Sequence, residues 1–191
     1  MRQNNILGYL IFWIFSSFSS VTLAQSFTAG DIITLQVNDY TLIETNHAPV
    51  VLTMSGSVAG APVSSVSNSD MFLKLSSLVP GGTAREVTAR ISSGSIPQGT
   101  NLSVVAAPCT LTNSGGNLGN VVTTPINLSS TDQNLILGIG SCYTGTGYND
   151  GYKLTYKWSP TNLPASYGLI QSTTSPVNIT IVYTITAHNG N

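Results

Sequence analysis

Apolar and polar residues alternate with a period of two near the carboxyl terminus. Over residues 177–186 the odd positions are Val, Ile, Ile, Tyr and Ile, and four of the five even positions are Asn or Thr. Successive side chains of a strand point to opposite faces of a sheet, so this pattern predicts a strand with one face on a core. A shorter run, in which Ile33, Leu35 and Val37 alternate with polar residues, predicts another strand near the amino terminus.

Further strands are expected in short segments rich in β-branched or aromatic residues. These are residues 50–54, 71–75, 86–91, 102–106, 134–139, 153–158 and 167–171. Turn signals separate them at residues 80–82, 95–99, 113–117 and 149–151, while residues 56–69 suggest a weak strand or a long loop. No stretch combines a sustained helical period with caps.

Roughly nine short strands separated by turns favour an all-β fold, an antiparallel β-sandwich with Ig-like or jelly-roll-like connections. A closed barrel is the second choice. No fixed repeat or convincing linker divides the chain, so we expect residues 25–191 to form a single domain.

The amino terminus has the composition of a secretory signal peptide. Arg2 is the only charged residue before Asp31, and an apolar stretch over residues 6–18 leads to Thr-Leu-Ala ending at Ala24. The apolar stretch has about 13 residues, fewer than the ~20 that a membrane-spanning helix needs. We expect residues 1–24 to be cleaved, with an uncleaved anchor as the alternative, and the protein to be secreted or exposed at the cell surface. In a bacterium it would reach the periplasm or a fimbrium.

Two cysteines, Cys109 and Cys142, lie in the exported part. An even pair in an oxidising compartment predicts a disulfide bond. A zinc site or a reactive thiol is less favoured, because no His lies nearby in sequence and no basic neighbour lowers either thiol pKa.

The low content of charged residues argues against several classes of function. Only 7% of the 191 residues are charged, against about 25% in a typical domain. A net charge of −1 gives no basic footprint for nucleic acid. The only histidines, His47 and His188, stand in an expected loop and next to the chain end, and the carboxylates are scattered. We therefore expect no enzymatic activity, no cofactor and no metal.

A glycine-rich stretch, residues 137–147, superficially suggests a phosphate-binding loop. A turn and an expected strand follow it, not the helix that such a loop requires, so a bulge or tight loop around Cys142 is favoured. Asn149 and Asp150 could contribute to a Ca²⁺ site, but one carboxylate is few for that ion.

Aromatic residues concentrate in the last third of the chain. Tyr and Trp rings stack on sugars and anchor protein interfaces, which makes Tyr143, Tyr148, Trp158 and Tyr167 candidate ligand-binding residues. The alternative is a core role, favoured because Tyr152, Leu154, Tyr156 and Trp158 share one face of an expected strand.

Three segments, residues 85–91, 96–104 and 177–186, resemble strands of secreted bacterial fimbrial or pilin-like subunits and of spore-coat-like Ig-type domains. The resemblance implies a structural or adhesive role in fimbriae, in subunits that accept a strand from a neighbour. The cysteines lie farther from the amino terminus than in the best-known fimbriae, so the sequence leaves strand exchange open. We expect an exported surface subunit that binds copies of itself or other exported proteins, with a secreted glycan- or protein-binding module as the alternative.

Overall fold

The computed structural model describes residues 29–188, which contain two antiparallel sheets packed face to face. The expected signal peptide at residues 1–24 lies outside this range. Contacts divide the chain into two units, residues 1–36 and residues 37–191. In the first unit, the described residues 29–36 form no helix or strand, and the two sheets belong to the second unit.

Sheet A contains seven strands. In spatial order they are β5 (Gly115–Gly116), β9 (Cys142–Tyr143), β2 (Val66–Leu78), β10 (Tyr152–Pro160), β4 (Thr100–Ala106) and β7 (Ile126–Asn127). The seventh strand, β1 (Tyr40–Thr45), lies outside this order and pairs with β2 alone. Sheet B has the order β11 (Thr180–Ala187), β3 (Arg85–Ser93), β8 (Gln133–Ile139) and β6 (Asn120–Val121). Among residues 29–188 the single helical element is the short 3₁₀ helix η1 (Tyr167–Leu169).

Alternating apolar residues of the central strands form the core. Leu73 on β2, Val104 on β4 and Leu154 on β10 have no exposed surface, and Val87 on β3 and Ile136 on β8 face them from sheet B. The all-β prediction is confirmed, as is the packing of two antiparallel sheets. The segments expected around residues 71–75, 86–91, 102–106, 134–139 and 153–158 all lie in strands.

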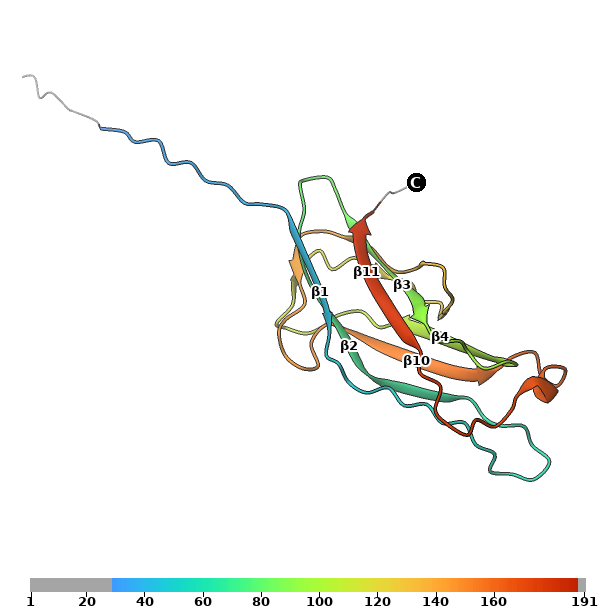
Figure 1. Ribbon diagram of the computed structural model, residues 1–191. Coiled ribbons are helices and arrows are strands. Elements are labelled where there is room, and N and C mark those ends of the chain that lie inside the picture. The colour runs from blue at the N-terminus through green and yellow to red at the C-terminus, as the bar shows by residue number, and fades with distance from the viewer. Residues whose placement is uncertain (1–28, 189–191) are drawn as a thin grey trace, which may run out of the picture. The chain divides into compact units, whose positions relative to one another are not determined.

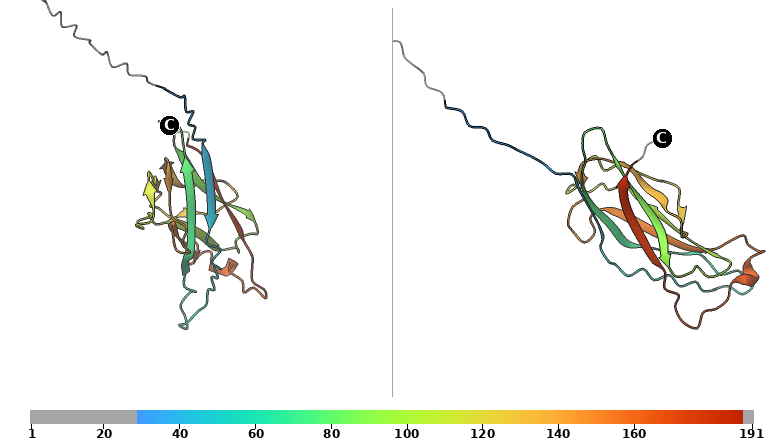
Figure 2. Two further views of the ribbon diagram at one scale, coloured as in Figure 1. Left: turned by 90° about the vertical axis from the view of Figure 1, so that its left-hand side faces the viewer. Right: turned by 45° about the horizontal axis from the view of Figure 1, so that its top comes forward.

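One side of the sandwich ends in two adjacent free edges. β1 pairs only with β2, β11 pairs only with β3, and the two strands lie close to each other (Figure 1). Figure 2 shows the same strands from two further directions. A strand edge without a partner exposes a row of backbone N–H and C=O groups.

Three of the expected strands are absent from the described residues. No strand forms at residues 33–37 or 50–54, because alternating side chains do not by themselves supply a partner edge. At residues 167–171 the backbone closes local turns instead, as Ile170 N–H donates to Tyr167 O over 3.1 Å. The carboxyl-terminal strand begins at Thr180, so Val177 is about half exposed.

Within the described part of the chain, no helix is long and apolar enough to cross a bilayer.

The register of β11 predicts a difference between two neighbouring substitutions. Ile181 packs against the core and lies opposite Ile91, whereas Thr180 is exposed. Ile181→Asp should lower the free energy of unfolding by about 2 kcal/mol or more, because it places a carboxylate among apolar side chains. Thr180→Asp should change it by less than about 0.5 kcal/mol. Urea denaturation midpoints measure both, and equal losses would show that this register is wrong.

Candidate functional site

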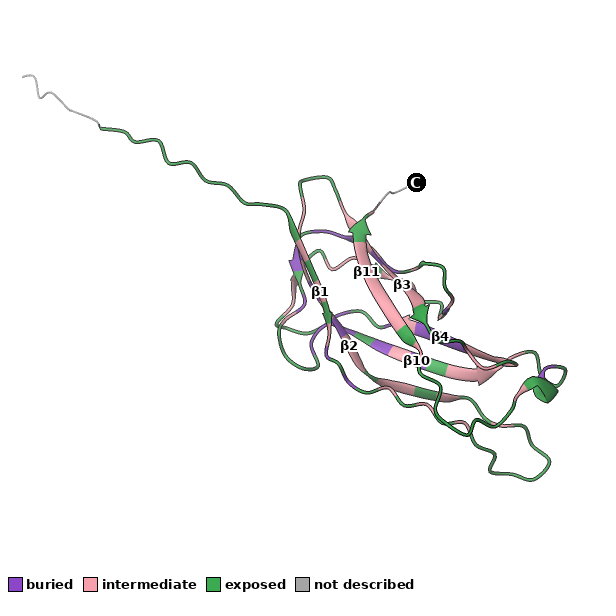
Figure 3. Cartoon of the chain, viewed as in Figure 1, coloured by how far each residue is buried: buried purple, intermediate pink, exposed green. Residues whose placement is uncertain are grey.

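The free side of the sandwich contains a groove with a volume of about 660 Å³. One wall is the segment after β1, residues 50–54, and the other is residues 173–179 together with the start of β11. Met71, Leu102 and Tyr156 line its base. Figure 3 shows that β11 is only partly buried along most of its length, so this groove leaves the core incompletely covered.

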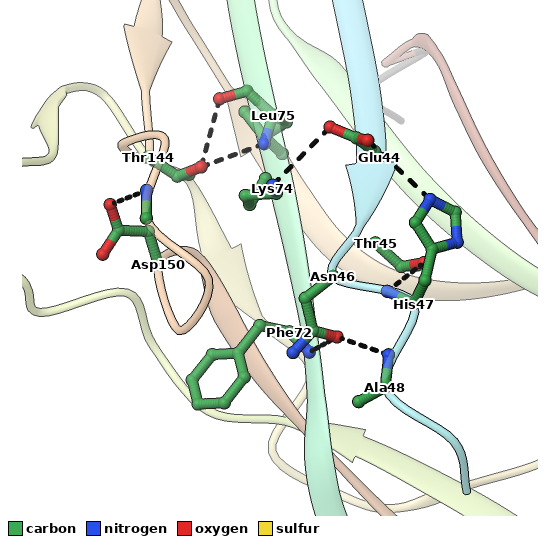
Figure 4. Close-up of polar contacts among 11 residues, drawn as sticks. Glu44, Thr45, Asn46, His47, Ala48, Phe72, Lys74, Leu75, Thr144 and Asp150 are labelled. Carbon is green, nitrogen blue, oxygen red and sulfur yellow. Dashed lines mark hydrogen bonds and ion pairs between the residues drawn. The ribbon is translucent and has the colours of Figure 1, made fainter.

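Asn46 determines where the first wall leaves sheet A. Its side-chain oxygen accepts hydrogen bonds from Phe72 N–H at 3.1 Å and Ala48 N–H at 3.3 Å (Figure 4). Its amide nitrogen donates to Asp70 O at 2.9 Å. The side chain is buried and takes the place that the next backbone group of a continuing strand would occupy. Pairing with β2 therefore ends here, and the chain continues beside the groove unpaired.

An ion pair joins the two sheets at the opposite end of β1. Arg85 at the start of β3 donates to the Asp39 carboxylate just before β1. Within sheet B, the His188 ring nitrogen Nδ1 lies 2.8 Å from Glu86 Oε2 on β3, and the His188 backbone N–H donates to Ala84 O. The contact between Arg85 and Asp39 ties the sheets together at one end, while the groove opens toward the other.

Two tyrosines that line the groove, Tyr156 and Tyr183, bring their hydroxyl groups together. The hydroxyl groups of Tyr156 and Tyr183 hydrogen-bond to each other, and Tyr156 Oη also donates to Met71 Sδ at 3.2 Å. Burial raises the pKa of Tyr156 to about 12 and raises the pKa of Tyr183 well above its ordinary value. Both phenols are therefore neutral and serve as packing residues at physiological pH.

A polar contact also fixes Trp158 in the groove. Its indole N–H donates to Thr100 Oγ1 at 2.9 Å, and the half-buried ring lines the groove. Among the residues described, none of those lining the groove is charged. The groove therefore suits an uncharged, largely apolar occupant.

The four aromatic residues proposed from the sequence lie at several places. Tyr143 on β9 is opposite Ser76 of β2, and Trp158 is opposite Val66, ten residues away, or roughly 33 Å along a strand. Tyr148 is exposed and lines a shallow pocket with Phe72. Tyr167 begins η1, which packs on Gly99 beside Thr100 and so lies at the same end of the fold as Trp158.

Cys109 and Cys142 are both buried within the core cluster as free thiols. Burial raises the pKa of the Cys142 thiol to about 11, and the charge of Cys109 is the second cause. At physiological pH the Cys142 thiol therefore stays protonated and is a poor nucleophile.

The glycine-rich stretch forms a tight loop that is held internally. The Asp150 carboxylate is buried and accepts a hydrogen bond from a backbone N–H of its own loop, that of Gly147 at 2.6 Å (Figure 4). It also accepts a hydrogen bond from the Asn113 amide. Thr144 Oγ1 accepts from Leu75 N–H at 3.0 Å, which extends the short β9 pairing onto β2. Asp150 therefore has a structural role in this loop.

His47 lies in the loop after β1, as expected. Its side chain is 78% exposed, and Nε2 is 3.7 Å from Glu44 Oε1. Within residues 29–188, no three His, Cys, Asp or Glu side chains cluster as a metal site would require.

No protein-family model matches the chain, and neither a curated protein nor a solved structure gives a significant match.

The groove was not predicted from the sequence. Its walls are residues 50–54, expected to be a strand, and residues 173–179, which include the start of another. The available signal was Asn46 in front of residue 50, because an Asn side chain often hydrogen-bonds backbone groups nearby and so forms a turn. In the structure the next residue, His47, has a positive φ of 54°.

The tyrosine pair predicts a loss of stability at alkaline pH. Folding raises the pKa of Tyr156 from 10 to about 12, so the unfolded state releases its proton first. The stabilising contribution is therefore complete below pH 10 and is lost as the pH rises toward 12. Urea midpoints between about pH 8 and about pH 12 should fall, and fall less steeply in Tyr183→Phe, which removes one buried phenol. The same slope in both proteins would contradict this assignment.

Proposed function

We propose that this protein is an exported structural subunit of a surface polymer, of the pilin type, whose groove accepts a β-strand from another polypeptide. The observation that carries this proposal is the combination of two adjacent free edges, β1 and β11, with an uncharged groove beside the end of β1 and the start of β11 that reaches the core. Unprotected edges favour the addition of a strand, and natural monomers normally cover them.

An added strand would both pair with the free backbone edge on this side of the sandwich and cover its partly exposed apolar side chains. Backbone groups of the incoming strand would pair with the free edge of β11, and its alternate side chains would cover Ile179, Ile181 and Tyr183. The low charge content is compatible with this role, because few charges have to be desolvated when subunits pack.

A disulfide bond between Cys109 and Cys142 belongs to this proposal. Both side chains are buried in one cluster of the core. In an oxidising compartment the bond would close a loop of about 34 residues, which stabilises the fold by about 3–4 kcal/mol in the chain-entropy estimate.

The disulfide can be tested by alkylation of the exported protein. Both cysteines are buried, so even free thiols would react slowly with the alkylating reagent in the folded protein. The protein is therefore denatured without reductant before alkylation. We expect mass spectrometry to find no alkylated cysteine in this sample and two in a sample reduced first. Two alkylated cysteines without reduction would exclude the bond.

Assembly is tested on the exported chain over a range of concentrations. Donor and acceptor surfaces that differ generate open-ended oligomers, so we expect a series of species beyond the dimer by size exclusion with light scattering, and fibres by electron microscopy. A monomer at every concentration would contradict the structural-subunit proposal.

A secreted glycan-binding module is the second candidate, favoured by a shallow pocket of about 480 Å³. The ring of Tyr148 is 62% exposed there, beside Phe72, Asp70 and Lys153, a combination of an aromatic face with charged groups that suits a sugar. Specific binding on a glycan array that is lost in Tyr148→Ala would favour this function.

A further inference from the structure

We infer that the shallow pocket beside Tyr148 binds a sugar that carries a carboxylate, and that Lys153 is the residue that recognises this charge. The inference rests on the second candidate function, glycan binding, and it names the class of sugar that the pocket takes.

One rim of the pocket is a turn that a buried side chain holds in place. Ala48 and Pro49 form this rim shortly after Asn46. The Asn46 side-chain oxygen accepts hydrogen bonds from Ala48 N–H and from Phe72 N–H on β2 (Figure 4). The rim is therefore fixed to a strand that forms part of the floor of the pocket.

The other rim is the loop that carries Tyr148 and Asn149. The buried Asp150 carboxylate holds this loop, because it accepts hydrogen bonds from Gly147 N–H and from the Asn113 amide. Both rims thus have a geometry that is set before a ligand arrives, which reduces the entropy that is lost on binding.

The floor of the pocket brings an aromatic ring and an ammonium group together. Lys153 on β10 lies directly opposite Phe72 on β2, so the two side chains are neighbours on one face of sheet A. This face points away from the core, because the residues on either side of Lys153, Tyr152 and Leu154, are buried. With the exposed ring of Tyr148, the pocket offers apolar surface for a pyranose ring beside a positive charge.

The charges of the pocket favour an anionic ligand. Asp70 Oδ2 accepts a hydrogen bond from the Asn68 amide at 2.7 Å, and Asp70 N–H donates to Asn68 Oδ1 at 3.0 Å. The Lys153 ammonium, in contrast, has neither an ion pair nor a hydrogen bond within residues 29–188. Three other cationic side chains pair with carboxylates, those of Lys74, Arg85 and Arg90. A ligand carboxylate would give Lys153 a comparable partner.

A carboxylate alone is not enough to hold a ligand in this pocket. An exposed ion pair contributes little to binding, because water and salt screen it. Contact between a sugar ring and the aromatic surface of Tyr148 and Phe72 supplies the apolar part of the affinity. The pocket therefore suits a sugar acid, such as a uronic or a sialic acid, better than a small organic acid.

The pocket is separate from the groove, because none of the described residues lines both. Subunits that assemble through the groove would therefore each present the pocket. A polymer with one weak site in every subunit binds a repeating acidic glycan with high avidity.

A glycan array tests the class of ligand on the chain from residue 25 onward. The array carries sialylated and uronic-acid glycans, each beside the same glycan with its carboxylate reduced to an alcohol. We expect binding to the acidic glycans, and binding at least about tenfold weaker to the reduced forms, because the charge-assisted contact with Lys153 is lost. Binding to the acidic glycans should also weaken as sodium chloride is raised from about 50 mM to about 500 mM.

Three substitutions separate recognition of the charge from contact with the ring. Lys153→Met keeps the apolar stem of the side chain, and it should lower acidic-glycan binding at least about tenfold and remove the preference over the reduced form. Tyr148→Ala should weaken the binding of both forms, because both contact the ring. Lys157→Met is the matched control and should change neither, because Lys157 is exposed on the same strand but lies outside the pocket. All three variants should keep the urea midpoint of the wild type, because these side chains are exposed.

The outcomes separate this inference from the functions proposed above. If acidic and reduced glycans bind equally and only Tyr148→Ala weakens them, glycan binding stands and this inference is wrong. If Lys157→Met lowers binding as much as Lys153→Met, the general charge of this face attracts the glycan, and Lys153 is not the recognising residue. If no glycan binds, this inference and the glycan-binding function both fail, while the series of oligomers still decides the structural-subunit proposal.

Discussion

The structure depends on how the hydrogen-bonding groups at the edge of each sheet are satisfied. Toward β6 and β7 the two sheets connect, because Ile91 N–H donates to Ser129 O at 2.7 Å and Leu128 N–H donates to Leu102 O at 2.9 Å. On the opposite side β1 and β11 have no such connection along the groove. Ile181 and Tyr183 are only partly buried at the same place, so unpaired backbone groups and incompletely covered apolar side chains lie together there.

The period of two predicted the central strands correctly, because each sheet of a sandwich buries one face and every second side chain of its strands points into the core. Leu73, Val104 and Leu154 alternate with outward-facing residues, and each lies in a strand as expected. The prediction failed at residues 33–37, where the side chains alternate but the backbone forms no strand. Alternation indicates which face a strand would bury, but it does not show that the edge of another strand is available for pairing.

The groove could not be derived from the sequence, because its walls are irregular segments brought together by tertiary contacts. Asn46 ends the pairing of β1 through three hydrogen bonds that local sequence does not specify. The tyrosine pair joins β10 and β11 across the two sheets, 27 residues apart in sequence. Trp158 was singled out from the sequence for its chemistry, and the structure places it in the groove.

The ion pair between Arg85 and Asp39 has a consequence for how the sandwich opens. It ties the residue before β1 to the first residue of β3, so the two sheets are held together at that end. At the groove, residues 50–54 and 173–179 form no strand and lack such a tie. Segments with few hydrogen bonds open first, so separation of the two sheets should begin at the groove, with the end near Arg85 as its hinge.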